Sequence, residues 1–226
     1  MPLSELIRLV LLMNTETENN SDDKCLVYFI RHGLTQANLE RRYIGSRSNP
    51  GLSSDSRLLI AERVRSGEVP EINSLWVSPM RRALETAKLY FPQKQALVSD
   101  DLKERDFGIW DGLTWEDLKD IELYRRFIDT EGRVTPPEGE AYEDYARRLD
   151  LVLEKIKTLI AEEPGHFPLA IVCHGGPVRY WTGKVFEKGE EFHNYMLSGA
   201  GCLAIKVAAA DLKITSVYDF YSKQRD

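Results

Sequence analysis

A chain of 226 residues is long enough for one sizeable α/β domain and too short for two comfortable ones. Its 42% of hydrophobic and 29% of charged residues are typical of a globular protein, and the net charge of −6 argues against a general nucleic-acid binder. No run approaches the ~18 apolar residues of a membrane span. An anionic ligand would therefore have to be attracted by a local cluster of basic side chains.

The three cysteines, Cys25, Cys173 and Cys202, all lie in apolar, strand-like runs and form no CxxC pair. An odd number without such a pair predicts neither a disulfide framework nor a zinc site, and it fits a reducing, cytoplasmic compartment. Residues 1–24 lack a basic start and a small-residue cleavage site, so a signal peptide is not expected. We expect a mobile or loosely docked extension over 1–24 and one domain over 25–226.

Apolar β-prone runs alternate with helical periods along the domain. This alternation predicts a mostly parallel sheet in an α/β fold. The helix at Ser78-Pro79 is expected to use the serine as its N-cap, and the helix at Pro177 to follow a tight Gly-Gly turn. The expected elements are a strand at 25–30, a helix at 55–65, a strand at 72–77, a helix at 79–90, a strand at 95–99, an irregular segment at 100–112, a helix from 114 with Trp115 and Leu118 inward, a helix at 141–161, a strand at 169–173, a helix from 177, and strands at 201–207 and 214–220.

Groups that suit an anion follow three of these strands. Arg31 and His32 end the first strand, Arg82 lies in the first turn of the helix after the second, and His174 follows the strand at 169–173. Because the carboxyl ends of parallel strands meet at one edge of a sheet, we expect these groups to converge. Two guanidinium groups can bind phosphate oxygens, and two histidines can supply a nucleophile and a further donor.

A general acid is still required, and Glu104 in the irregular segment can provide it, shielded by Phe107 and Trp110. No metal-ligand spacing occurs, so we expect no metal and no cofactor. Taken singly, each of these side chains is more often a surface charge or a structural residue. Their joint placement at strand ends favours a functional site over separate structural roles.

Four segments carry a family resemblance: RHGLTQAN (31–38), SPMRRALETA (78–87), LKERDFGIWDG (102–112) and VCHGGPVR (172–179). In this order they resemble the signatures of the histidine phosphatase superfamily, the phosphoglycerate mutase-like clan. The resemblance extends from about Cys25 to the C-terminus. It implies a three-layer α/β/α sandwich around a mostly parallel sheet with an antiparallel edge strand.

The resemblance also implies roles for individual residues. His32 matches the nucleophile that becomes phosphorylated, and Glu104 matches the acid that protonates the leaving oxygen. Arg31 and Arg82 match the phosphate-binding arginines; Arg82 is chosen over its neighbour because the family's arginine directly precedes alanine. His174 matches the second histidine, which contacts the phosphoryl group. Further candidates for the phosphate pocket are Asn38, Gly45 and Gly175.

The expected partner is a small phosphorylated metabolite, while the sequence carries no signal of oligomeric state. The interval between Glu104 and His174 lacks the long insertion usual in mutases and resembles the phosphatases. Within them, YIGSRSNPGLS (43–53) and PPEGEAYEDYARRL (136–149) look most like α-ribazole-5′-phosphate phosphatases of cobalamin nucleotide-loop assembly. Ala141 and Asn49 depart from that group, which tends to have serine and an acidic residue there. A broad-specificity phosphatase, a fructose-2,6-bisphosphatase-like enzyme and a phosphoglycerate mutase are the alternatives.

Two readings with other chemistry compete. Residues 173–179 fit Cys-x-x-Gly-x-x-Arg, a phosphate-binding loop in which Cys173 would be the nucleophile. Against this, Cys173 closes an apolar strand, and Pro177 lacks an N–H that such a loop needs. A non-catalytic binding module on the same scaffold is the second reading, but such modules usually lose the nucleophile or the acid, and this chain retains His32 and Glu104.

Overall fold

The computed structural model describes residues 25–185, 197–207 and 214–219. The expected extension at 1–24 and the end of the last predicted strand at Phe220 lie outside the described residues. Among those described, no helix is both long enough and apolar enough to cross a membrane.

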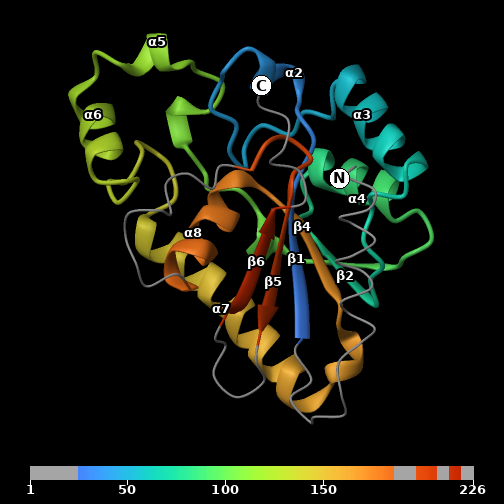
Figure 1. Ribbon diagram of the computed structural model, residues 1–226. Coiled ribbons are helices and arrows are strands. Elements are labelled where there is room, and N and C mark those ends of the chain that lie inside the picture. The colour runs from blue at the N-terminus through green and yellow to red at the C-terminus, as the bar shows by residue number, and fades with distance from the viewer. Residues whose placement is uncertain (1–24, 186–196, 208–213, 220–226) are drawn as a thin grey trace.

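A six-stranded sheet forms the centre of the molecule, in the order β3-β2-β4-β1-β5-β6 (Figure 1). The first four strands of that order run parallel, β5 pairs antiparallel with β1, and β6 pairs antiparallel with β5 at the edge. The expected mostly parallel sheet with an antiparallel edge is therefore confirmed. The strands are β1 (Cys25–Arg31), β2 (Ser74–Val77), β3 (Ala96–Val98), β4 (Leu169–Cys173), β5 (Cys202–Val207) and β6 (Ile214–Asp219).

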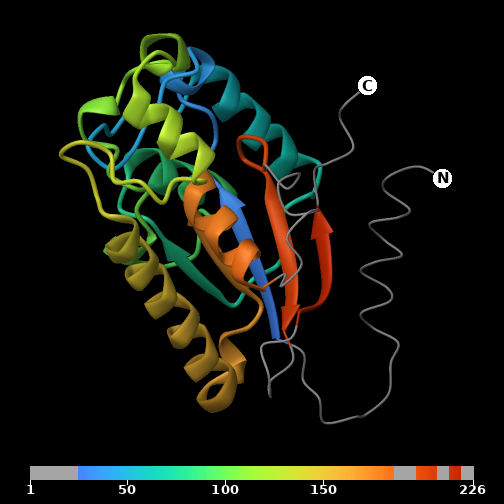
Figure 2. The same cartoon turned by 90° about the vertical axis from the view of Figure 1, so that its left-hand side faces the viewer.

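Helices cover both faces of the sheet, which confirms the three-layer α/β/α sandwich (Figures 1 and 2). Successive side chains of β1 point to opposite faces: Phe29 packs with the α7–α8 side, and Ile30 packs with the α3–α4 side. The short helices α2, α5 and α6 lie beyond the carboxyl ends of the parallel strands (Figure 1). The helices are α2 (Gln36–Leu39), α3 (Ser54–Arg65), α4 (Arg81–Tyr90), α5 (Trp115–Leu118), α6 (Glu122–Asp129), α7 (Tyr142–Glu162) and α8 (Gly175–Val185).

Two expected helix starts are wrong. Helix α4 begins at Arg81 rather than at Pro79, with Met80 as its N-cap; the Ser78 hydroxyl lies 2.8 Å from Nε2 of His174 and accepts from the N–H of Met80 at 3.4 Å. Helix α8 begins at Gly175, so the two glycines form its first turn instead of a separate tight turn. Pro177 is tolerated there because the N–H groups of a first turn have no partner within the helix.

The segment from Trp110 to Phe127 packs as a small aromatic cluster of its own. Trp110, Leu118, Tyr124 and Phe127 are buried together, with ring centroids of Trp110 and Phe127 5.3 Å apart. Trp115, expected to point inward, is instead 54% exposed. Its helix α5 is a single turn, capped by Thr114, and one turn buries only one of the two residues.

Candidate active site

The register of β1 and β4 brings the two histidines together. Arg31 pairs with Cys173 across the parallel strands, so His32 and His174 follow at neighbouring strand ends. Their ring centroids are 5.0 Å apart, with the planes inclined at 62°. The backbone N–H of His32 donates to the carbonyl of Cys173 at 2.9 Å, which fixes the two strand ends relative to each other.

The hydrogen bonds of His32 define which ring nitrogen carries the proton. Nδ1 lies 2.7 Å from the carbonyl oxygen of Gly33, an acceptor, so Nδ1 is the protonated nitrogen. Nε2 therefore presents a lone pair, and Nε of Arg82 donates to it at 3.2 Å. Burial, followed by the charges of Arg82 and Arg31, holds the pKa of His32 well below its usual range. The ring is therefore a neutral imidazole at neutral pH, and the lone pair of its Nε2 accepts from Arg82.

Arg82 is a fully buried cation held by backbone carbonyls. Its Nη2 donates to Gly45 at 3.0 Å and its Nη1 to Ser48 at 3.1 Å. Burial lowers its pKa to about 10, so the guanidinium stays charged at neutral pH. Arg81 instead is solvent-exposed and pairs with Glu85 at 2.8 Å. The geometry thus separates the two neighbouring arginines and places Arg82 beside His32.

Two buried nitrogen atoms in this centre have no hydrogen-bond partner within the described part of the chain: Nε of Arg31 and Nδ1 of His174. Arg31 donates through Nη1 to the carbonyl of Leu197 at 2.6 Å, and Nε2 of His174 lies 2.8 Å from the hydroxyl of Ser78. Burial, and then the charge of Arg82, holds the pKa of His174 well below its usual range. Unpartnered buried polar atoms are costly, and an anion that accepts from them would remove that cost.

Glu104 faces the same centre from the loop after β3 and is only 8% exposed. Its Oε1 accepts from the N–H of Arg105 at 2.9 Å, and its Oε2 accepts from the N–H of Gly176 in the first turn of α8 at 3.0 Å. Of the two expected shielding residues, Phe107 lines the cavity that Glu104 faces, whereas Trp110 does not. Tyr145 lies beside Glu104; burial and the glutamate raise the pKa of its hydroxyl well above the usual range.

Two arginines hold the Glu104 loop from behind. Nη1 of Arg148, on α7, donates to the carbonyls of Asp101 and Lys103 at 2.9 and 2.7 Å, and its Nη2 donates to that of Glu104 at 3.2 Å. Arg148 also binds both carboxylate oxygens of Glu140, at 2.7 and 2.9 Å. Arg105, within the loop, donates to the carbonyls of Gly132, Val134 and Glu140. The position of Glu104 thus depends on α7 and on the segment before it.

Gly176 is predicted to be intolerant of a side chain. A Cβ atom there would collide with Oε1 of Glu104 and lie 2.7 Å from the hydroxyl of Tyr145. At Gly175 the nearest atom, Nε of Arg31, would be 3.5 Å away, an ordinary contact. We expect Gly176→Ala to lower kcat by ~10²-fold through displacement of Glu104, and the control Gly165→Ala, where a Cβ atom meets nothing within 4 Å and which does not line the cavity, to leave kcat unchanged. Steady-state kinetics of both variants checks this; equal losses would contradict it.

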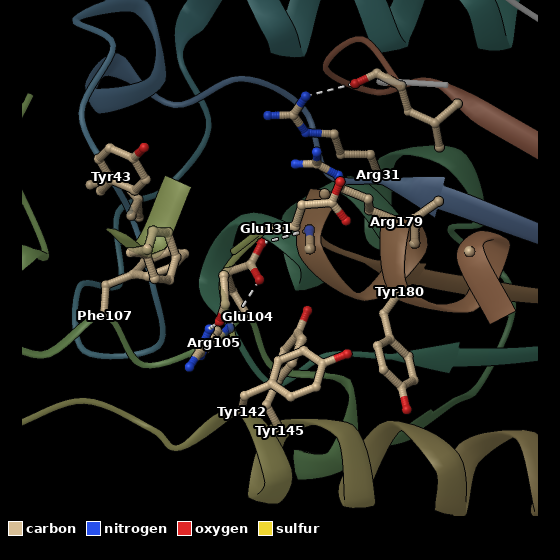
Figure 3. A pocket seen from close by; sticks show the side chains of 18 of the residues that line it. Arg31, Tyr43, Glu104, Arg105, Phe107, Glu131, Tyr142, Tyr145, Arg179 and Tyr180 are labelled. Atoms are coloured by element: carbon tan, nitrogen blue, oxygen red, sulfur yellow. Dashed lines mark hydrogen bonds between the residues drawn. The ribbon is translucent and has the colours of Figure 1, made fainter. Parts of the chain in front are cut away.

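A cavity of about 890 Å³ opens onto this centre. Arg31, His32, Asn38, Glu104 and Gly175 line it, whereas Gly45 does not and instead lies behind Arg82. Asn38 directs its Oδ1 to the N–H of Thr35, 3.1 Å away, as part of the capping box of α2. Figure 3 shows Arg31 and Glu104 facing the same space. In the described ranges no group of three or more His, Cys, Asp or Glu side chains could hold a metal ion.

Cys173 does not have the environment of a reactive thiolate. The side chain is fully buried in β4, and burial raises the pKa of its thiol. Its Sγ points to the carbonyl of His174 at 3.8 Å rather than to a ring of N–H donors. A buried, protonated thiol is inert, so the geometry disfavours the cysteine-phosphatase reading.

The two buried neutral histidines predict sensitivity to acid. Below pH 6.5 a histidine in the unfolded chain gains a proton, whereas His32 and His174, with lowered pKa values, do not. The unfolded state then binds more protons, so the free energy of unfolding falls as the pH falls, by at most about 1.4 kcal/mol per pH unit for each histidine. Urea denaturation at pH 7.5 and 5.5 measures this, and His32→Gln should weaken the pH dependence. An unchanged dependence in the variant would contradict it.

Comparison with known proteins gives concordant findings. The model of the histidine phosphatase superfamily (branch 1) matches residues 27–219. Bifunctional protein Rv2228c of Mycobacterium tuberculosis is 38% identical over 71% of this chain and 44% of its own length. The 6-phosphofructo-2-kinase/fructose-2,6-bisphosphatase of Gallus gallus is 29% identical over 82% of this chain and 37% of its own length. The chain thus spans less than half the length of these relatives.

Among solved structures, the alpha-ribazole phosphatase from Shigella flexneri superposes with a TM-score of 0.68. It is 22% identical, and the match covers 80% of this chain and 90% of that one. At this level of identity the similarity concerns the fold.

Proposed function

Because this chain belongs to the histidine phosphatase superfamily, we propose that its domain, residues 25–226, is a phosphomonoesterase that works through a phosphohistidine at His32. The observation that carries the proposal is the state of that ring: Nδ1 donates to Gly33, and the lone pair of Nε2 faces the charged Arg82. A neutral imidazole nitrogen with a fixed lone pair is a competent nucleophile toward phosphorus.

In the first step, Nε2 of His32 attacks the phosphorus atom, and the bond from phosphorus to the ester oxygen breaks. Arg31, Arg82 and Nδ1 of His174 stabilise the negative charge on the phosphoryl oxygens. This stabilisation is strongest when the donors are already oriented toward those oxygens before the reaction. For His174 to donate, its Nδ1 carries the proton while Nε2 accepts from the hydroxyl of Ser78, 2.8 Å away. The leaving alkoxide takes its proton from Glu104, which enters this step as the protonated carboxyl group and lies within the same cavity.

In the second step, water attacks the phosphohistidine, and Glu104, now ionised, accepts a proton from that water. The bond from phosphorus to Nε2 breaks, inorganic phosphate leaves, and the neutral imidazole is restored. The two N–H donors on Glu104, from Arg105 and Gly176, hold the carboxylate in place in this step. The proposed mechanism gives both His32 and Glu104 a role, and this supports a catalytic domain over a non-catalytic binding module.

The test of this proposal is direct trapping of the intermediate. Rapid quenching during turnover of a ³²P-labelled phosphomonoester is expected to leave label on the protein that is stable in base and labile in acid, and peptide mapping should place it at His32. Label that is stable in acid, or that maps to Cys173, would overturn the proposal.

For the physiological substrate we propose α-ribazole-5′-phosphate, as in the enzymes that segments 43–53 and 136–149 resemble. The similar fold of the Shigella flexneri alpha-ribazole phosphatase is consistent with this choice. The second candidate is a sugar bisphosphate, favoured by the 29% identity to the fructose-2,6-bisphosphatase relative. Comparing kcat/KM for these two compounds, 3-phosphoglycerate and phosphoserine distinguishes a specific phosphatase from a mutase and from a broad-specificity enzyme.

A further inference from the structure

Away from Arg31, His32 and Glu104, part of the cavity wall is made of aromatic rings, alongside arginine and aliphatic side chains. We call this part the aromatic lobe, and its rings come from Tyr43, Phe107, Phe127, Tyr142, Tyr145 and Tyr180. Figure 3 shows Tyr43 and Phe107 on one side of the opening and Tyr142, Tyr145 and Tyr180 on the other, with Glu104 between them. The cavity, at about 890 Å³, is of the size that holds a whole metabolite rather than a phosphate group alone.

Two of these tyrosines are held in place by their own hydroxyl groups, which form hydrogen bonds with residues outside the cavity. The hydroxyl of Tyr43 lies 2.6 Å from that of Tyr124, and the hydroxyl of Tyr180 donates to Asp150 at 2.8 Å. Neither Tyr124 nor Asp150 lines the cavity. The hydroxyls are thus engaged, and the two residues present their rings to the cavity.

Ring-to-ring packing fixes the same walls further. Tyr43 and Phe107 meet edge to face at 5.4 Å, and Tyr145 and Tyr180 do so at 6.0 Å. Rings that are already ordered lose little conformational freedom when a ligand binds. The walls are therefore suited to a planar, apolar group.

Two of the basic side chains along the lobe are bound within the protein. Arg42 donates to Glu40 at 2.7 Å and to the carbonyl of Gly112 at 2.9 Å. Arg105 donates to backbone carbonyls, and its guanidinium group lies over the ring of Phe127, 5.5 Å from the ring centroid. Glu131, Arg133 and Arg179 line the solvent side with mixed charge. This arrangement favours an uncharged group in the lobe over a second phosphate.

We propose that the aromatic lobe is the leaving-group subsite and that it selects phosphomonoesters whose alcohol carries a planar ring system, such as a nucleoside-like body. This inference rests on the proposed phosphatase function for its placement next to the scissile bond. The specificity-determining residues are Tyr43, Phe107 and Tyr180, which touch the ring and take no part in the phosphoryl chemistry.

Binding of phosphonates tests the subsite without any turnover. Benzylphosphonate and ethylphosphonate share the anionic group and differ in the ring, and neither is hydrolysed. Calorimetry on the full chain should show that benzylphosphonate binds about tenfold more tightly than ethylphosphonate. The reason is that contacts between aromatic rings contribute binding free energy beyond the burial of apolar surface. Tyr180→Leu and Phe107→Leu should each reduce that ratio severalfold. Trp115→Leu, an exposed aromatic outside the cavity, is the matched control and should leave it unchanged.

Equal affinities of the wild-type protein for the two phosphonates would overturn the inference, and so would a bisphosphonate that binds more tightly than benzylphosphonate. This wild-type comparison holds even if a variant fails to fold. Turnover provides the second readout: kcat/KM for a nucleoside 5′-monophosphate should exceed that for methyl riboside 5-phosphate, which has the same leaving hydroxyl and no base. If the protein prefers benzylphosphonate but hydrolyses no phosphomonoester, the proposed phosphatase function is wrong and the subsite stands. If it hydrolyses phosphomonoesters but shows no preference for a ring, the subsite is wrong and the phosphatase function stands.

Discussion

Replacement of His32 by alanine is expected to abolish phosphatase activity, with a loss of kcat of about 10⁴-fold or more. The reason is that no other described side chain in the cavity offers an imidazole nitrogen: His174 is fully buried, and its Nε2 is bonded to Ser78. The phosphoenzyme signal should vanish with the activity. Steady-state kinetics and acid–base quenching of labelled protein measure both effects, with circular dichroism to show that the variant is folded.

Two control variants complete this test. His166→Ala removes a histidine bonded to Ser74 and Glu163, away from the cavity, and should retain wild-type activity. Cys173→Ala should also remain active, because the buried thiol takes no part in the chemistry. An inactive, folded Cys173 variant together with an active His32 variant would establish the cysteine mechanism instead.

Replacement of Glu104 by glutamine is expected to have the second largest effect, and the size of that effect should depend on the leaving group. For alkyl phosphates kcat should fall by roughly 10²–10⁴-fold, the usual contribution of a general acid. For 4-nitrophenyl phosphate the loss in the phosphorylation step should be about tenfold or less, because nitrophenolate departs without a proton. Single-turnover kinetics with the two substrates isolates that step.

The exposed carboxylate of Asp100, which is paired with Lys103 at 3.0 Å at the start of the same loop, gives the matched control. Asp100→Asn should leave both rates unchanged. If Glu104→Gln slows both substrates equally, the glutamate acts by positioning and not as the proton donor. The amide of the glutamine places an N–H donor against the N–H of Arg105 or Gly176, and the resulting displacement would slow both substrates alike.

The convergence of the site could be predicted because its main residues follow strands with strong local signals. β4 is five fully buried residues, and β1 is nearly so, which makes the strand ends at Arg31 and Cys173 easy to locate. Parallel pairing then places whatever follows those ends at one edge. The four motifs supplied the candidate roles, and Arg82 could be distinguished from Arg81 by its position before alanine.

Other parts had no usable local signal. Ser78 precedes a proline and has the pattern of an N-cap, yet its hydroxyl is bonded to His174, 96 residues away. Nothing around Arg148 indicates that it holds three carbonyls of the loop that carries Glu104. Trp115 was expected inward from its spacing to Leu118, but helical spacing carries little information in a helix of one turn.

The sequence by itself determined the α/β class, the order of the strands and of the longer helices that cover the sheet, and which residues stand at the carboxyl ends of β1 and β4. It could do so because strands and helices leave hydrophobic patterns among residues that are close together in the chain. Only the tertiary structure decided the proton position on His32, the anchoring of Glu104 by Gly176 and Arg148, and the aromatic lining of the cavity. These depend on contacts between side chains and backbone far apart in the chain, and such contacts exist only once the elements have packed.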